Sequence, residues 1–486
     1  MPNQPDNYFG IIFPLLILPL FTAGFIWLGL LNSIFFLPFT ILLILSIAWL
    51  IVRLNLQVYL VKLMAVLLPF SIELPLTSGI MLQFPGEILT GIAAVTVIIE
   101  IFLHPSSLKS YLSGEVRYVL PLIIIFCVSM LFSSIPLVSA KYTLISITYI
   151  LVFLILLKKL FVTWPGLFRQ LILLYSLSFS IIILYASYLF WQYGLNPVVT
   201  KGIFRPWYKD HTITGASAAI LCAFWLAGSY SAKNPMHKLF MAAAGFFFMY
   251  AVLLTHSRAA ILSLVVFIFV WIVMQLKIHP RHLAIMGAVI IMVIIGFREP
   301  IYNRIYFNKY VSHKQEMEWS EFIKSTGNVT TDDSNVERLN RWYAGIKMFI
   351  DRPATGFGPG TYQFVYIPYQ NTHLTNRLTV TNPYKIPENS GGTAHSEYIL
   401  ALSEMGLPGL AALLLLFARW VWIVFVKALN HSNRKNLIVV FAALSTYLFH
   451  AFFNNFLNTD KFALLFWGMT AYLISSYEMN YDKQLL

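Results

Sequence analysis

Long apolar stretches, separated by short polar connections, run through almost the whole chain. Each stretch is about 15 to 25 residues long, the length that an α-helix needs to cross the ~30 Å hydrocarbon core of a bilayer. We therefore predict an all-α fold, a polytopic membrane bundle of about 14 (12–14) transmembrane helices. The predicted helices lie near residues 9–30, 34–52, 59–72, 85–103, 118–134, 143–157, 170–190, 214–232, 239–254, 258–275, 283–297, 396–426, 437–453 and 460–478.

One polar segment, residues 298–394, interrupts this pattern and is too long to be a plain connector. Loops of this size usually carry function. Within it, Ser334-Asn-Val-Glu337 has the pattern of a capping box that opens an amphipathic helix, which continues to about Ile350. We accordingly divide the chain into four parts: N-terminal membrane helices (1–200), membrane helices with outer-face arginine motifs (201–297), a long outward-facing loop with short helices (298–394), and the helix that follows His395 with the C-terminal membrane helices (395–486).

Composition and charge support a membrane protein and exclude other classes. Hydrophobic residues make up 58% of the chain and charged residues 11%, against about 25% charged in globular proteins. Soluble multidomain, disordered, fibrous and nucleic-acid-binding proteins are thereby excluded. The net charge is +13, of which the long loop supplies only +2 (11 Lys or Arg minus 9 Asp or Glu). The other basic residues lie mostly in short connections, which positive-inside topology places in the cytoplasm, so the long loop faces the outer side of the membrane.

His395 is the first candidate for chemistry. It stands where the long loop becomes the predicted helix 396–426, and we expect it in the first turn of that helix. The positive end of the helix dipole disfavours imidazolium there, which leaves a neutral ring able to act as a general base. The alternative is an interfacial histidine bonded to loop backbone. The same helix, if unbroken, would be longer than the hydrocarbon core of the membrane is thick. We expect a break at Gly406-Leu-Pro-Gly409.

Arginines on the outer segments are the second set of candidates. Arg258 lies between two predicted spans, Arg205 lies in an aromatic-rich connection, and Arg338 and Arg341 lie on the amphipathic loop helix. A guanidinium group donates two parallel hydrogen bonds and stays charged, which suits a diphosphate ligand. The alternatives are snorkelling to lipid phosphates, an aromatic belt around Arg205, and an exposed, solvated face for the two loop-helix arginines.

A glycine-rich turn follows the amphipathic helix. Gly356, Gly358 and Gly360 permit tight turns and close approach of the backbone to a bulky or anionic group. The outer segments contain no Asp-x-Asp pair and no His/Asp cluster with metal-ligand spacing. A metal-independent mechanism is therefore the simpler inference.

Three motifs, in this order along the chain, resemble the O-antigen ligase family of integral membrane enzymes. They are Ser257-Arg258-Ala259; Arg338-x-x-x-Trp342 followed by Pro353-x-x-Gly-x-Gly-x-Gly360; and His395-Ser-Glu-Tyr-Ile-Leu-Ala-Leu-Ser-Glu-Met-Gly-Leu-Pro-Gly409. The chain departs from the family pattern twice. Ser396 replaces the usual Asn, and Asp210-His211 replaces the Asn expected in the Arg205 loop.

The resemblance implies a membrane glycosyltransferase of the O-antigen ligase type. It would transfer a glycan, with inversion, from an undecaprenyl-diphosphate-linked donor to a hydroxyl of lipid A-core, without cofactor or metal. His395, Arg258 and Arg338 would be catalytic, as base and as ligands of the diphosphate. The substrate-binding residues would be Arg205, Arg341, Gly356, Gly358, Gly360 and Tyr362, with the glycine turn shaping the glycan side of the pocket. The partners would be donor, acceptor and membrane lipids, with no nucleic acid.

Other functions stay open at this stage. A polysaccharide polymerase or a protein O-oligosaccharyltransferase of the same family would use the same catalytic residues and differ in the acceptor. A lipid-linked glycan transporter or flippase is the alternative from another class. Transport requires polar groups along a path through the bilayer. Mid-span charges are few in this chain, with Glu87 as one candidate, and the polar chemistry concentrates on the outer segments.

Overall fold

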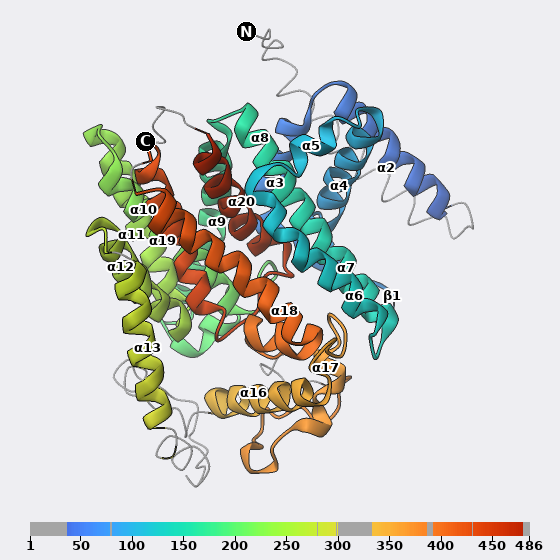
Figure 1. The fold of residues 1–486 in the computed structure, drawn as a ribbon, viewed down its shortest axis with the longest axis vertical. Helices are drawn as coiled ribbons and strands as arrows, with labels where there is room; N and C mark the ends of the chain where they lie inside the picture. The colour runs from blue at the N-terminus through green and yellow to red at the C-terminus, as the bar shows by residue number, and fades with distance from the viewer. Residues whose placement is uncertain are drawn as a thin grey trace.

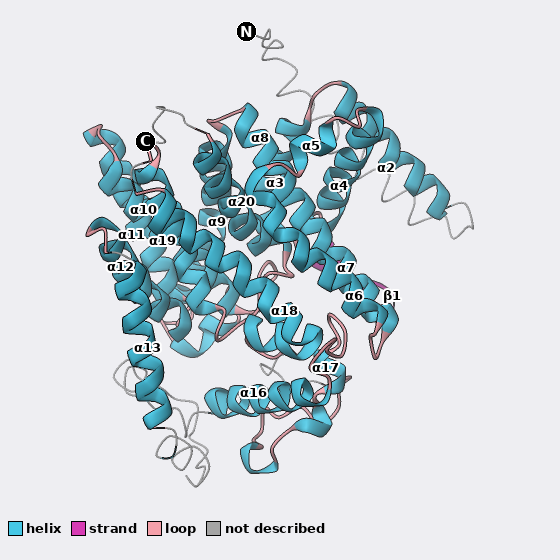
Figure 2. Ribbon diagram, viewed as in Figure 1, coloured by secondary structure: helices cyan, strands magenta, loops and turns pink. Residues whose placement is uncertain are grey.

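The structure is a computed structural model that is almost entirely helical (Figures 1 and 2). The predicted span 9–30 and residues 300–332 of the long loop lie outside the residues that it describes. These described residues are 36–77, 80–278, 280–297, 299, 333–385, 392–429 and 431–479.

The helices follow the predicted apolar stretches closely. Before the long loop they are α2 (Phe36–Arg53), α3 (Gln57–Leu67), α4 (Gly86–Leu103), α5 (Ser107–Tyr111), α6 (Leu120–Leu131), α7 (Pro136–Tyr149), α8 (Leu157–Thr163), α9 (Leu167–Gln192), α10 (His211–Ser231), α11 (Pro235–Leu254), α12 (Arg258–Gln275) and α13 (Pro280–Gly296). From the loop onward they are α16 (Asp333–Asp351), α17 (Tyr362–Val365), α18 (Glu397–Trp422), α19 (Arg434–His450) and α20 (Asp460–Glu478).

Eight helical segments among the described residues are long and apolar enough to cross a membrane, so the chain is a multi-pass membrane protein. They are 86–103, 114–131, 136–163, 167–192, 211–231, 235–254, 258–275 and 397–427. The total of about fourteen spans stays a prediction. One segment is much longer than the predicted helix 143–157, because the π-helical stretch Ile150–Leu156 joins α7 to α8 without a break.

The all-α prediction is wrong at one place. Strands β1 (Ile72–Thr77) and β2 (Ile80–Phe84) pair as an antiparallel hairpin, with Ile72 opposite Phe84. The predicted helix 59–72 instead ends in a short 3₁₀ turn at Phe70. A strand alternates its side chains between two faces, and the sequence Ile-Glu-Leu-Pro-Leu-Thr fits that alternation better than a helical period.

Helix α10 is almost entirely buried and packs against α11, α12 and α19. Its first half is rich in small residues, which let neighbouring backbones approach closely. A Cβ atom on Gly215 would lie 3.0 Å from the Ser257 Cβ and 3.0 Å from the Thr255 Oγ1. The start of α10 is therefore packed directly on the turn that joins α11 to α12.

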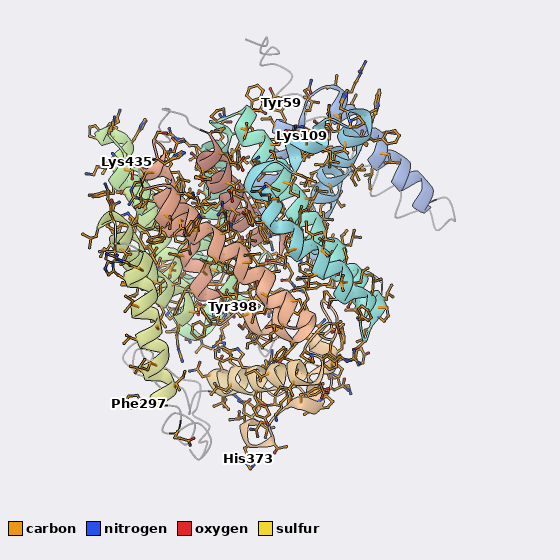
Figure 3. All side chains as sticks on the ribbon, viewed as in Figure 1. Tyr59, Lys109, Phe297, His373, Tyr398 and Lys435 are labelled. Carbon is orange, nitrogen blue, oxygen red and sulfur yellow. The ribbon has the colours of Figure 1, made fainter. Side chains whose placement is uncertain are left out.

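Two ion pairs link helices that are far apart in the sequence, and Figure 3 shows Lys109 and Lys435 at one end of the molecule. Lys158 pairs with Glu478 at 2.8 Å. Arg419 binds Glu115 through two hydrogen bonds of 2.6 and 2.7 Å. The loop residue His373 lies at the opposite end in the same view, where α16 lies across the bundle (Figures 1 and 3). The two ends of the molecule thus differ in architecture, and the loop elements gather at one of them.

Helix α18 breaks where the sequence predicts. Gly406 has φ 67° and ψ −166°, which is not helical, and it separates a first arm beginning at Glu397 from the long second arm. The first arm packs against α16. The first arm, which begins two residues after His395, thus packs on the loop elements, and the second arm continues beyond the kink into the bundle.

Candidate active site

The glycine-rich turn is bound to the first arm of α18. The amide groups of Gly360 and Tyr362 donate to the two carboxylate oxygens of Glu404, at 2.8 and 2.9 Å. The amide of Gly358 donates to the carbonyl oxygen of the same glutamate at 2.9 Å. Glu404 is buried, so this carboxylate satisfies donors that water cannot reach.

Close contact explains why the turn needs glycine. Gly356, Gly358 and Gly360 all have positive φ, at 67°, 106° and 77°. A Cβ on Gly356 would lie only 2.2 Å from the carbonyl carbon of Glu404, and one on Gly360 would lie 2.8 Å from Tyr142. The turn is predicted to shape the glycan pocket, but its observed contacts are hydrogen bonds and close packing with α18. Its role toward a glycan stays a prediction.

We expect Glu404→Ala to destabilise the folded protein by roughly 2–5 kcal/mol, because two buried amide donors lose their acceptor. Glu404→Gln keeps one acceptor oxygen and should lose less. Thermal unfolding of the purified protein in detergent measures both changes. An unchanged melting temperature in Glu404→Ala would contradict the assignment of Glu404 as the anchor of this turn.

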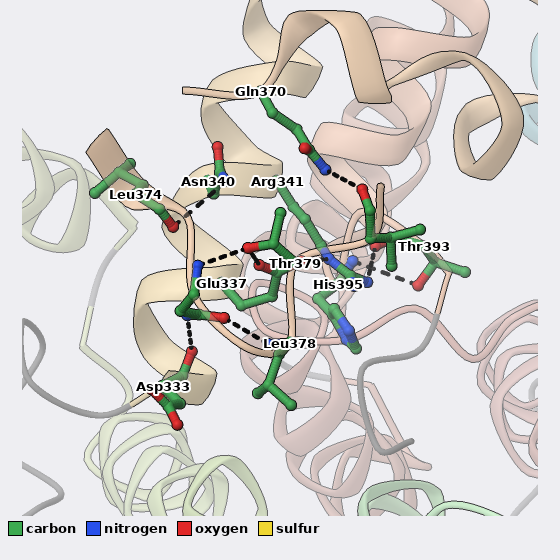
Figure 4. A network of polar contacts seen from close by, with 12 residues as sticks. Asp333, Glu337, Asn340, Arg341, Gln370, Leu374, Leu378, Thr379, Thr393 and His395 are labelled. Carbon is green, nitrogen blue, oxygen red and sulfur yellow. Dashed lines mark hydrogen bonds and ion pairs between the residues drawn. The ribbon is translucent and has the colours of Figure 1, made fainter. Parts of the chain in front are cut away.

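The loop helix α16 presents Arg341 to the protein interior, not to solvent. Its side chain is 0% exposed, which contradicts the alternative of a solvated face for this residue. The guanidinium donates to Glu337 at 2.8 Å and to the carbonyl of Thr393 at 2.8 Å (Figure 4). Glu337 also accepts from Thr379 at 2.9 Å, so it does not cap the helix as the capping-box pattern predicts.

Tyr362 is likewise a buried contact between elements. Its hydroxyl donates to the carbonyl of Arg341 at 2.7 Å, and its ring stacks on Tyr366 with 4.8 Å between centroids. Burial raises the pKa of Tyr366 to about 12, so its hydroxyl stays protonated at neutral pH. The substrate-binding roles predicted for Tyr362 and Arg341 stay predictions, while their observed contacts fix α16 to the turn and to Thr393.

His395 precedes α18 instead of lying in its first turn. Ser396 is the N-cap residue, and its hydroxyl accepts from the amide of Ile399 at 3.4 Å. His395 has φ 50°, a left-handed conformation that is uncommon for residues other than glycine. Such strained residues persist only where their surroundings fix them, and they cluster at functional sites. Its half-buried side chain stands at the junction between the loop and the bundle.

The turn between α11 and α12 holds a second left-handed histidine, His256, with φ 51°. Ser257 caps α12 by accepting from the amide of Ala260 at 3.4 Å, and Arg258 is the first residue of the helix. Burial lowers the pKa of His256, although the carbonyl of Leu254, which bonds the ring, acts in the other direction. The half-buried Arg258 therefore stands on a rigid, capped turn.

Asp210 and His211 open α10 and belong to the same site. Asp210 caps the helix by accepting from the amide and the hydroxyl of Thr212, at 2.8 and 2.7 Å. The pKa of Asp210 is lowered overall. Desolvation acts to raise this pKa, but it is outweighed by nearby His211, by the two hydrogen bonds from Thr212 and by the charge of His395. The carboxylate is thus ionised at neutral pH.

Electrostatic proximity brings the candidates from distant segments together. His211 lies within range of the charges of Arg338 and His256. His450, a buried residue at the end of α19, lies within range of Arg338 and Asp210. The start of α10 thus lies near four other parts of the chain: His395, the α11–α12 turn, α16 and the end of α19.

Sequence reasoning named Asp210 only as a departure from a family pattern, named His211 also as a basic residue of the aromatic-rich Arg205 connection, and did not name His450. A polar residue that ends an apolar helix is the one signal that could have drawn attention to His450. Arg205 lies elsewhere in the same loop as Asp210. Its side chain is exposed and makes no hydrogen bond or ion pair with the described residues, so its predicted role stays open.

The described residues contain no group of three or more His, Cys, Asp or Glu side chains that could hold a metal ion. The candidate groups are the imidazole of His395, the carboxylate of Asp210 and the guanidinium groups of Arg258 and Arg338. This set can take up a proton and bind an anionic group.

The comparisons with known proteins agree with the motifs. Residues 242–414 match the family model described as O-antigen ligase. The matched segment contains the α11–α12 turn, α16, the glycine-rich turn and the first arm of α18, and it therefore includes Arg258, Arg338 and His395. No curated protein matches the chain.

Proposed function

We propose, from the match of residues 242–414 to the O-antigen ligase family model, that the protein transfers a glycan from an undecaprenyl-diphosphate-linked donor to an acceptor hydroxyl. Lipid A-core is the proposed acceptor, and the periplasmic face of the inner membrane is the proposed place of reaction. The observation that supports the proposal is that the start of α10 lies near both candidates, with Asp210 close to His395 and His211 close to Arg338.

The proposed reaction is an in-line displacement at the anomeric carbon. The acceptor oxygen forms a bond to this carbon while the bond between the carbon and the diphosphate oxygen breaks on the opposite side, so the configuration inverts. His395 takes the proton of the acceptor hydroxyl. The electron pair leaves with undecaprenyl diphosphate, whose growing negative charge Arg258 and Arg338 stabilise. No residue needs a metal ion in this scheme.

A transfer assay tests the proposal and identifies the acceptor. The purified full-length protein receives an undecaprenyl-diphosphate-linked glycan in detergent with EDTA, together with lipid A-core, a second donor molecule or a peptide. Transfer to lipid A-core supports the ligase. Transfer to the second donor would make the protein a polymerase, and transfer to the peptide an oligosaccharyltransferase. No transfer by folded protein to any of the three would overturn the proposal and favour transport of the lipid-linked glycan.

The acidic limb of the pH–rate profile should depend on Asp210. Its carboxylate attracts a protonated His395 and so favours the inactive form of the base. In Asp210→Asn this attraction is lost, and the acidic limb of kcat/KM should move to lower pH. Glu73→Gln is the matched control, because Glu73 is a carboxylate of the outer hairpin that pairs with Lys209 instead. An unmoved limb in Asp210→Asn would refute the coupling.

A further inference from the structure

The left-handed conformation of His395 requires support from its neighbours, since an L-residue with a side chain rarely adopts φ 50°. Two ties flank this residue, and both lead to the same element. We call this element the α19–α20 corner; it comprises residues 447–457 and lies beyond the segment that matches the family model.

The first tie lies two residues before His395. The hydroxyl of Thr393 donates to the Oδ1 of Asn455 at 2.8 Å. The same hydroxyl oxygen accepts from the amide of His395 at 3.5 Å. Asn455 is 8% exposed, so this hydrogen bond is sheltered from water.

The second tie lies two residues after His395. The amide of Glu397 donates to the carbonyl of Ala451 at 2.9 Å. One carboxylate oxygen of Glu397 accepts from the Tyr447 hydroxyl and from the amides of Phe456 and Leu457, at 2.7, 2.8 and 2.9 Å. Three donors on one buried oxygen leave the carboxylate no freedom to rotate without losing hydrogen bonds.

Helix α16 closes the opposite side. Arg341 donates to the carbonyl of Thr393 at 2.8 Å, and the indole of Trp342 donates to the carbonyl of His395 at 3.5 Å. The Trp342 ring also packs on Phe453 of the corner, with 6.1 Å between centroids. The segment 393–397 is thus held from two sides, by α16 and by the α19–α20 corner.

We infer that Asn455 and Glu397 are positioning residues for His395, which they hold through the backbone on either side of it. This inference rests on the proposed function of His395 as the base. A base must lie within hydrogen-bond reach of the hydroxyl it deprotonates, and a small displacement lowers the rate steeply. Neither residue is assigned to the binding of the donor diphosphate, so substituting either one should lower kcat and leave KM nearly unchanged.

Asn455→Ala tests the inference in the full-length protein. We expect kcat to fall by about tenfold or more, with KM for donor and acceptor within about twofold of wild type. Asn455→Asp keeps an acceptor for Thr393 and should restore most of the activity. Thr393→Val removes the donor of the same bond and should reproduce Asn455→Ala, and the two changes together should be no worse than either alone.

Asn433→Ala is the matched control for loss of stability. Asn433 is 7% exposed and donates to the carbonyls of Ser476 and Met479, both at 3.0 Å, between the start of α19 and the end of α20. We expect it to lower the melting temperature about as much as Asn455→Ala and to leave kcat near wild type. An equal loss of kcat in Asn433→Ala would overturn the inference, as would a normal kcat in Asn455→Ala.

Glu397 gives a second, independent readout. Glu397→Gln keeps an oxygen that can accept from the three donors, whereas Glu397→Ala keeps none. We expect kcat to fall more in Glu397→Ala than in Glu397→Gln. Equal kcat in the two variants would overturn the role of this carboxylate.

A comparison in the His395→Ala background separates positioning from a general structural role. There, Asn455→Ala should not lower the residual rate further, because the group that it positions is gone. A further loss equal to that in wild type would show that Asn455 acts independently of His395. Full activity of His395→Ala itself would instead overturn the proposed function, so the two failures are distinguishable.

Discussion

Replacing His395 with alanine should lower kcat by about 10²–10⁴-fold, the contribution that a positioned general base makes. The reason is that no other group would then take the proton from the acceptor hydroxyl at the point of attack. Donor binding should change little, because the diphosphate is assigned to Arg258 and Arg338. Single-turnover transfer from the lipid-linked donor, measured at saturating acceptor, gives the rate of the chemical step directly.

His373→Ala is the matched control for this experiment. His373 is an exposed histidine of the long loop, in the short 3₁₀ turn Thr372–Leu374, and Figure 3 shows it at one end of the molecule. We expect wild-type turnover from this variant. A His395→Ala protein that keeps more than about a tenth of the wild-type rate would rule out His395 as the base.

Arg258→Ala should lower kcat/KM by about 10²–10³-fold, the typical cost of removing one group that stabilises developing negative charge. Arg258→Lys keeps the positive charge but loses the planar guanidinium group, so its kcat/KM should lie between the values for Arg258→Ala and wild type. Donor affinity, measured by equilibrium binding of the lipid-linked glycan, should weaken in the same order. Adding salt should not restore activity, since the contact is lost and not merely screened.

Arg377→Ala is the comparison for a general effect of charge. Arg377 is an arginine of the long loop whose side chain is 54% exposed and pairs with Asp333 at the start of α16. It should leave kcat/KM within about twofold of wild type, because exposed ion pairs contribute little. If Arg258→Ala bound the donor as tightly as wild type and turned over normally, Arg258 would have no place in the diphosphate site.

Helix positions were predictable from sequence because the cause is local. The predicted span 258–275 matches α12, and the predicted end of the loop helix near Ile350 lies one residue from the observed end. Apolar length and capping residues set these limits, and both are read from neighbouring positions. The break in α18 at Gly406 was equally local, since glycine admits the positive φ that the kink requires.

The partners of the glycine-rich turn were not predictable in the same way. Glycine at 356, 358 and 360 indicates close approach to something, but the sequence does not say to what. The partner is Glu404, 44 residues from Gly360 along the chain, and it is brought there by the packing of the first arm of α18. A carboxylate that accepts backbone amides has no sequence pattern of its own.

By itself, the sequence determined that this is a helical membrane protein, where most of its described helices begin and end, and which residue types are available for chemistry. Hydrophobic length, turn residues and motif spacing act over a few residues and need no partner. Only the tertiary structure decided which of these residues meet: that Asp210 and Arg338 approach the His395 region, that Arg341 is buried, and that Asn455 ties Thr393 across 62 residues. The physical reason is that such contacts depend on how distant helices pack, and packing satisfies buried polar groups with whichever partner the fold brings near.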